Sequence, residues 1–221
     1  MKSVLTIVCV VLSSAGSAFA QPSQVYASVS GGVASAPDGA TGDVLGEVGF
    51  RVARNLYVFG NVGQFHNLQP DGVQATVDSL DSSLAAGGLS VTGTAHVPAW
   101  YSMGGLRWTV PVTNLHFTPY VFGGAGFARV TPSATFSYTS GTLIGTTTPP
   151  AAGEDITSQI ESLGDFTAPA PSTAVMFALG GGIDVPLASH LVANAGYRVS
   201  HISTDTPVSP QSLTFGVGYR F

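Results

Sequence analysis

A histidine and a serine near the end of the chain are spaced for nucleophilic chemistry. His201 and Ser203 are separated by one residue, so in an extended strand their side chains lie on the same face. A histidine base can activate a hydroxyl nucleophile that it contacts. The alternative is that both residues belong to the polar rim where a strand meets a loop. The pair therefore marks a candidate hydrolytic site at one strand end.

Other chemistry has weaker support in the residue spacing. The five histidines do not follow the spacing of metal ligands. The glycine clusters at residues 123–126 and 180–182 lack the Lys-Ser/Thr pair of a phosphate-binding loop. We therefore expect no metal and no cofactor, and we assign these glycines to close packing between strands.

Composition and the first residues restrict the class of protein. Charged residues make up 9% of the chain, against about 25% in a typical soluble domain. Lys2 is the only lysine and acidic residues outnumber basic ones, which argues against nucleic-acid binding. Lys2, the apolar run 4–12 and Ala18-Phe19-Ala20 predict a cleaved signal peptide over residues 1–20. We expect residues 21–221 to form one exported domain.

The elements that would position these residues are short strands. Alternating runs bounded by Gly, Pro, Asn and Ser indicate strands rather than helices. We expect eight of them, at about 25–33, 43–52, 56–66, 98–110, 118–130, 174–185, 191–202 and 212–221. Most approach the roughly 9 to 11 residues that a tilted transmembrane strand needs.

The segments between these strands alternate in length. Three are tight turns, at residues 53–55, 111–114 and 186–190. Four are longer or more polar, at about 34–42, 67–97, 131–173 and 203–211. Short periplasmic turns and long extracellular loops are typical of outer-membrane barrels. Helical spacing at 73–86 and 156–163 predicts a small helix in each of the two longest loops.

The last strand shows the two faces most clearly. Leu213, Phe215, Val217 and Tyr219 share one face, and smaller or polar residues share the other. A transmembrane barrel would turn the apolar face to lipid, whereas a lipocalin-like soluble barrel would turn it inward around a ligand. Trp100 and Trp108 share a face about 20 Å apart along the axis, as expected of two interfacial aromatic anchors. The alternative is a pair of core tryptophans in a β-sandwich.

Arginines fall in the strands, whereas most acidic residues fall in the long loops. A charge in a transmembrane strand is tolerated where it points inward and meets a partner. Glu47 and Asp184 are the candidate partners. We predict an interior network of Glu47, Arg51, Arg107, Asp184, Arg198 and Arg220. This network either fills the barrel as a structural plug or acts as an ion gate.

The final residues, from Leu213 to Phe221, resemble the C-terminal assembly signal of outer-membrane proteins. The segments 119–126 and 196–198 resemble strands of the small opacity-type and OmpA-like eight-stranded barrels. The resemblance implies an all-β, eight-stranded antiparallel up-and-down transmembrane β-barrel. It also implies handling by periplasmic chaperones and the barrel-assembly machinery, with Phe215, Tyr219 and Phe221 as recognition residues.

An eight-stranded barrel has an interior just wide enough for side chains, so we do not expect a wide pore. Function is then expected in the loops at 67–97 and 131–173, as adhesion, surface protection or recognition of an extracellular ligand, without catalysis. The alternative is a structural role in stabilising the envelope. The expected surroundings are lipopolysaccharide and phospholipid of the outer membrane. A narrow ion channel remains an alternative.

A second resemblance concerns His201 and Ser203, which are similar to the His-x-Ser motif of outer-membrane lipid A deacylases. The resemblance implies an alternative function as a lipid hydrolase. The chain departs from that pattern because Thr204 and Asp205 follow the serine, and because Thr214 or Phe215 stands where an orienting glutamate is needed.

Overall fold

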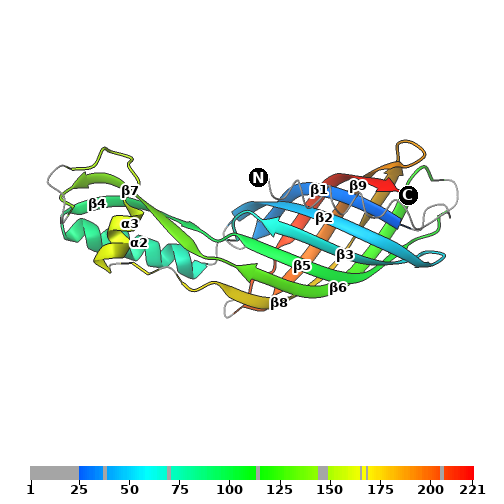
Figure 1. Cartoon of the computed structure of the whole chain (residues 1–221), viewed down its shortest axis with the longest axis horizontal. Coiled ribbons are helices and arrows are strands. Elements are labelled where there is room, and N and C mark those ends of the chain that lie inside the picture. Colours follow the sequence, from blue (N-terminus) through cyan, green and yellow to red (C-terminus); the bar gives the residue numbers. More distant parts are fainter. Residues whose placement is uncertain are drawn as a thin grey trace.

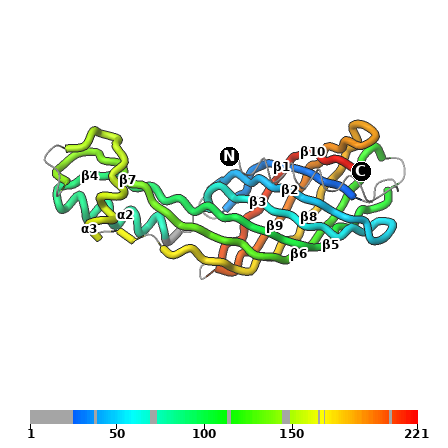
Figure 2. The backbone as a smooth tube through the Cα atoms, viewed as in Figure 1, coloured from blue at the N-terminus to red at the C-terminus, as the bar shows by residue number. Residues whose placement is uncertain are grey.

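The computed structural model describes residues 25–36, 39–68, 71–112, 115–143, 149–164, 166–167, 169–204 and 207–221. Within these ranges, ten strands and two helices form a closed barrel and a smaller module at one end of it (Figure 1). The carboxyl terminus lies at the end of the barrel that is remote from the module (Figure 2). The predicted signal peptide, residues 1–20, lies outside the described residues.

Eight strands close the barrel, and each is antiparallel to both of its neighbours. Their order around the ring is β1-β10-β9-β8-β6-β5-β3-β2. Their bounds are β1 Val25–Ala36, β2 Gly39–Ala53, β3 Leu56–Phe65, β5 Ala99–Thr109, β6 Thr118–Val130, β8 Ser172–Pro186, β9 Leu191–Ile202 and β10 Gln211–Arg220. The predicted eight-stranded up-and-down barrel is confirmed.

The alternation along β10 shows which face points outward. Phe215 is 60% exposed, whereas its neighbour Thr214 is 8% exposed. On β8, Leu179 is 70% exposed and the adjacent Ala178 is 2% exposed. The apolar faces therefore point outward, as in a barrel surrounded by lipid. A lipocalin-like arrangement, with apolar faces around an internal ligand, is excluded.

The connections at the two ends of the barrel differ in length. Residues 54–55, 110–117 and 187–190 form the three short connections, at the end where the carboxyl terminus lies (Figure 1). This is the periplasmic end in an outer-membrane barrel. At the other end, the loop expected at 34–42 is mostly strand, because β1 and β2 stay paired up to Ala36 and Gly39. That prediction was wrong in extent.

The two longest loops fold together into the module. It contains α2 Asp71–Ala86 and β4 Leu89–His96 from the first loop, and β7 Ser133–Gly141 and α3 Thr157–Leu163 from the second. The two predicted helices are confirmed, whereas β4 and β7 were not predicted. These two strands form a separate antiparallel sheet (Figure 1). Neither described helix is long and apolar enough to cross a bilayer.

The module has a hydrophobic core of its own. Its fully buried side chains include Val77 of α2, Phe136 of β7, Ile160 of α3 and Ile156, which directly precedes α3. Gly93 of β4 allows the close approach of α2, because a Cβ atom there would lie 2.3 Å from Val77 Cγ1. The module is thus a folded unit with its own core rather than a pair of loops without a core at the barrel rim.

Both edges of the two-stranded sheet are covered. Helix α2 satisfies two amides of β4, since the Gly93 amide donates to Asp81 Oδ2 at 2.8 Å and the Ala95 amide to Gln74 Oε1 at 3.2 Å. The edge of β7 that faces away from β4 is hydrogen-bonded to the following loop. There the Tyr138 amide donates to the Glu154 carbonyl at 2.8 Å. Covered edges prevent unwanted strand pairing with other chains.

Candidate functional site

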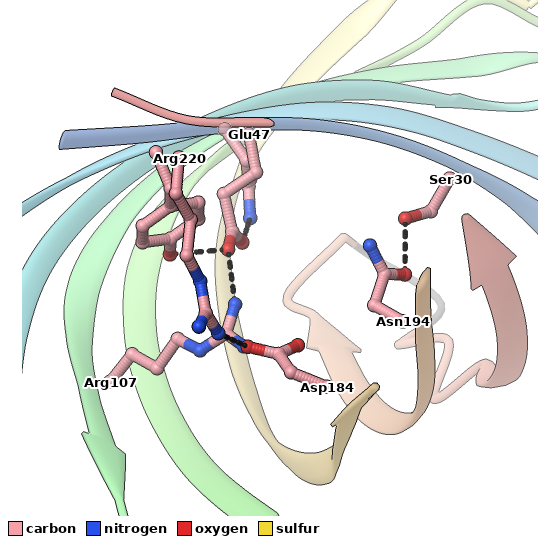
Figure 3. A network of polar contacts seen from close by, with 8 residues as sticks. Ser30, Glu47, Arg107, Asp184, Asn194 and Arg220 are labelled. Carbon is pink, nitrogen blue, oxygen red and sulfur yellow. Dashed lines mark hydrogen bonds and ion pairs between the residues drawn. The ribbon is translucent and has the colours of Figure 1, made fainter. Parts of the chain in front are cut away.

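The barrel interior holds a polar network centred on Glu47 (Figure 3). The Tyr26 hydroxyl donates to Glu47 Oε1 at 2.7 Å, and Asn61 Nδ2 donates to Oε2 at 3.3 Å. Arg107 Nη1 lies 3.3 Å from Glu47 Oε1. Residues from β1, β2, β3 and β5 therefore meet at one carboxylate.

Arg107 links Glu47 to a second carboxylate across the barrel. Its Nη2 lies 2.6 Å from Asp184 Oδ2, which also accepts from Arg220 Nη2 at 3.1 Å (Figure 3). The Arg107 guanidinium also lies 3.6 Å from the centre of the Tyr120 ring, a favourable cation–π arrangement. When all four groups are ionised, two arginines balance two carboxylates, so the network carries no net charge.

A second polar cluster lies further toward the module. Arg198 Nη2 is 2.5 Å from Asp43 Oδ2, and the Tyr101 hydroxyl donates to Asp43 Oδ1 at 2.9 Å. Arg198 Nη2 also donates to the Tyr101 hydroxyl at 2.7 Å. The Arg198 and Asp43 side chains are 5% and 0% exposed. This pair is also charge-balanced.

These positions refine the network expected from sequence. The structure brings Glu47, Arg107, Asp184 and Arg220 together, but Arg198 pairs with Asp43 in the separate cluster. Asp43 was missed, although it lies four residues before Glu47 in β2 and so shares its face.

Arg51 lies at the periplasmic mouth of the barrel, where its side chain is exposed, rather than deep in the interior. Its position continues the inward face of β2, but its side chain is exposed. Its pairing with Tyr57 keeps the register of Glu47 with Asn61, and the register shifts only after it, between Arg51 and Ala53. Alternation therefore assigns a face to Arg51 but does not show that the side chain is exposed so near the end of the strand.

An apolar layer closes the interior above the Asp43 cluster. It includes Phe65, Leu68, Val97, Met176 and Ile202, each at most 1% exposed. Below it, two cavities of about 30 and 40 Å³ border the polar networks. Cavities of this size hold only a few water molecules. The interior is therefore filled with side chains.

The family follows from comparison of the whole chain with known proteins. The model of the outer membrane protein beta-barrel domain matches residues 6–221. The chain belongs to this family. Membership places the protein in the outer membrane. No curated protein matches the chain.

Solved structures support the same fold. A major outer membrane protein of Thermus thermophilus is 12% identical, with a TM-score of 0.55 over 89% of this chain and 99% of that one. Neisserial surface protein A is 15% identical, with a TM-score of 0.52 over 89% and 96% of the two chains. Ail of Yersinia pestis is 13% identical, with a TM-score of 0.50 over 91% and 100%. At these identities the likeness concerns the fold alone.

In this outer-membrane barrel, Trp100 and Trp108 both lie on the outer face of β5, and each is 48% exposed. Both positions are compatible with interfacial anchors, and the alternative of two sandwich-core tryptophans is excluded by the fold. Their contact with lipid headgroups stays a prediction.

The terminal residues lie at the periplasmic end of the outer-membrane barrel. Phe215 and Tyr219 point outward from β10. The Tyr219 and Phe221 rings lie edge to face, with centres 5.0 Å apart, and the Phe221 amide donates to the Val25 carbonyl at 3.0 Å. The carboxyl terminus is thus fixed to the first strand. Recognition of these residues by the assembly machinery stays a prediction.

The structure gives His201 a different partner from the one considered in the sequence. His201 Nδ1 lies 2.9 Å from the Ser209 hydroxyl, and both residues are exposed. Among the described residues, no carboxylate is hydrogen-bonded to His201 to orient it. Within the same part of the chain, no group of three or more His, Cys, Asp or Glu side chains is placed to hold a metal ion. The candidate functional features are therefore the filled interior and the module.

Proposed function

We propose that this protein is a non-enzymatic surface-interaction protein in which the barrel is the membrane anchor and the module binds the partner. The observation that carries the proposal is the separate core of the module. Val77, Phe136, Ile156 and Ile160 bury apolar surface that an unstructured loop would leave exposed. A folded unit held outside the membrane offers a fixed binding surface at little entropic cost.

The charge of the two long loops restricts the partner. Residues 67–97 and 131–173 contain no lysine or arginine. They contain seven acidic residues, Asp71, Asp78, Asp81, Glu154, Asp155, Glu161 and Asp165. Like charges lower both the rate and the affinity of association. The proposed partner is therefore neutral or cationic, and a sulfated or otherwise polyanionic partner is disfavoured.

The filled barrel supports an anchoring role over transport. The polar networks balance their own charges, and the apolar layer of Phe65 and Met176 lies across the interior between them and the module. Attachment is among the roles of barrels with this fold, since Ail is named an attachment invasion locus protein. We also propose export by cleavage after residue 20 and assembly through Phe221, with lipopolysaccharide and phospholipid around the wall.

The test compares cells that display the full chain with cells that display a variant without the module. In this variant, β-turns join β3 directly to β5 and β6 directly to β8. We expect cells with the full chain to be retained on neutral or cationic surfaces, and cells with the variant to lose this retention.

The matched control is a heat-modifiable gel shift, which verifies that the shortened barrel still folds. Equal retention of the two cell types, or stronger retention of the full chain on heparin-coated surfaces, would contradict the proposal.

A further inference from the structure

One arginine of the barrel wall points toward the membrane. Arg129 lies on the outward face of β6, where Phe127 is 60% exposed, and between Ala128 and Val130, which are buried inside. The other arginines lie elsewhere: three point into the barrel and two lie at its periplasmic end, namely Arg107, Arg198, Arg220, Arg51 and Arg54. Arg129 is therefore the exception to the inward placement of strand arginines.

Arg129 is the first of three residues with N–H donors in a row across the outer face. Trp100 of β5 is its cross-strand partner, and Gln64 of β3 is in turn the partner of Trp100. Directly opposed side chains in antiparallel strands have Cβ atoms about 5 Å apart. The three positions thus form a row across β6, β5 and β3, with N–H donors on each side chain and with the arginine as its charged member.

The position of Arg129 in β6 indicates the depth of this row relative to the bilayer. Arg129 is the penultimate residue of β6, at the extracellular end of the strand. A charge on the lipid-facing wall is tolerated near the interface, where it reaches the headgroups. We therefore expect the row at the level of the headgroups of the outer leaflet.

Among the described residues, no carboxylate forms an ion pair with Arg129. In the same part of the chain, the carboxylates that form ion pairs are Glu47, Asp184 and Asp43, all inside the barrel and all bonded to other arginines. A guanidinium binds phosphate through paired hydrogen bonds, and neighbouring neutral donors can bind the remaining oxygens. We propose that Arg129, Trp100 and Gln64 bind a phosphate of a phosphorylated glycolipid, lipid A, in the outer leaflet.

The test uses the full chain in phosphatidylcholine nanodiscs. Trp108→Phe leaves Trp100 as the only tryptophan of a chain that has two, so its emission reports on the site. Titration with phosphorylated lipid A should give a saturable change. Arg129→Gln should weaken binding about tenfold, as expected for the loss of a charge-assisted hydrogen bond. Arg54→Gln, in the exposed periplasmic turn, should leave the affinity unchanged.

Two further ligands identify the source of the phosphate. Dephosphorylated lipid A and phosphatidylglycerol should both bind at least tenfold more weakly, and inorganic phosphate at millimolar concentration should not compete. Unchanged affinity in Arg129→Gln, with a normal heat-modifiable gel shift, would overturn the proposal. Equal binding of dephosphorylated lipid A, tight binding of phosphatidylglycerol or competition by free phosphate would each overturn it as well.

Discussion

Asp43 and Arg198 lie 155 residues apart in the chain and form an ion pair inside the barrel, with 2.5 Å between Oδ2 and Nη2. The pair joins β2 to β9 across the interior, and the Tyr101 hydroxyl of β5 bonds to both side chains. Because both charges are removed from water, each depends on the other for its stability.

Removal of one partner of the Asp43–Arg198 pair should therefore strongly destabilise the barrel. Asp43→Ala leaves the Arg198 guanidinium buried without its carboxylate, and we expect a loss of about 3–5 kcal/mol in the free energy of unfolding. Urea unfolding in lipid vesicles measures this change. The double variant Asp43→Ala/Arg198→Met should recover much of the loss, because it removes both charges. A single-variant effect below about 1 kcal/mol would show that the pair is not buried in this way.

The filled interior should not conduct ions. We expect no steady current in planar bilayers from the full chain, because the apolar layer with Phe65 and Met176 lies across the interior. Arg198→Ala should remain silent for the same reason, since that layer is unchanged. Stable single-channel steps from either protein would favour the ion-channel alternative over the anchoring role.

A larger side chain in the core of the module should unfold the module and leave the barrel folded. Gly93→Val places side-chain atoms where Val77 lies, since even a Cβ atom there would be 2.3 Å from Val77 Cγ1. Overpacking of this kind costs about 1–3 kcal/mol. We expect faster proteolysis within the module and an unchanged heat-modifiable gel shift. Thr92→Val, on the exposed face of the same strand, is the matched control and should resist proteolysis. Equal proteolysis of the two variants would contradict the described packing.

The stability of the loop before α3 should depend on pH through the ionisation of Asp155. The Thr157 hydroxyl and amide both donate to Asp155 Oδ1, at 2.6 and 2.9 Å, and hold the pKa of this carboxyl below its ordinary value. A carboxyl whose pKa is lowered in the folded state stabilises the fold above its unfolded pKa, and this contribution is lost as the pH falls through the folded pKa. The loop is therefore weakened only in acid.

Carboxyl NMR shifts of Asp155 measure this dependence directly. Thr157→Val removes the hydroxyl and should raise the pKa of Asp155 toward its ordinary value. Ser158→Ala, which removes a hydroxyl bonded to Gln159 instead, should have no effect. An unchanged pKa in Thr157→Val would contradict the assigned cause.

Alternation in the sequence was sufficient to predict the barrel strands and their faces. Residues such as Leu179 and Phe215 share an apolar face because a strand has a period of two, and this period is visible in the sequence. The exposed fractions in the structure then show that this face points outward. The period assigns a face but not a height in a tilted barrel, so it could not show that Arg198 meets Asp43 rather than Glu47 or Asp184. For the same reason it could not show that Arg51 is exposed near the end of β2.

The module could be predicted only in part. Helical spacing within one loop is a local signal, and it indicated α2 and α3. The sheet requires β4 to pair with β7, which lies more than 30 residues away across two barrel strands. The core at Val77 and Phe136 depends on that pairing. The sequence of either loop by itself therefore could not predict this core.

The most direct test of a membrane anchor with an external module is cysteine labelling on intact cells. The only cysteine, Cys9, lies in the predicted signal peptide, so single cysteines report on chosen positions. With a membrane-impermeant maleimide, we expect Thr92→Cys in the module to be labelled on intact cells. Leu187→Cys, in a short periplasmic turn, should be labelled only after the outer membrane is permeabilised, and labelling of Leu187→Cys but not Thr92→Cys on intact cells would contradict this orientation.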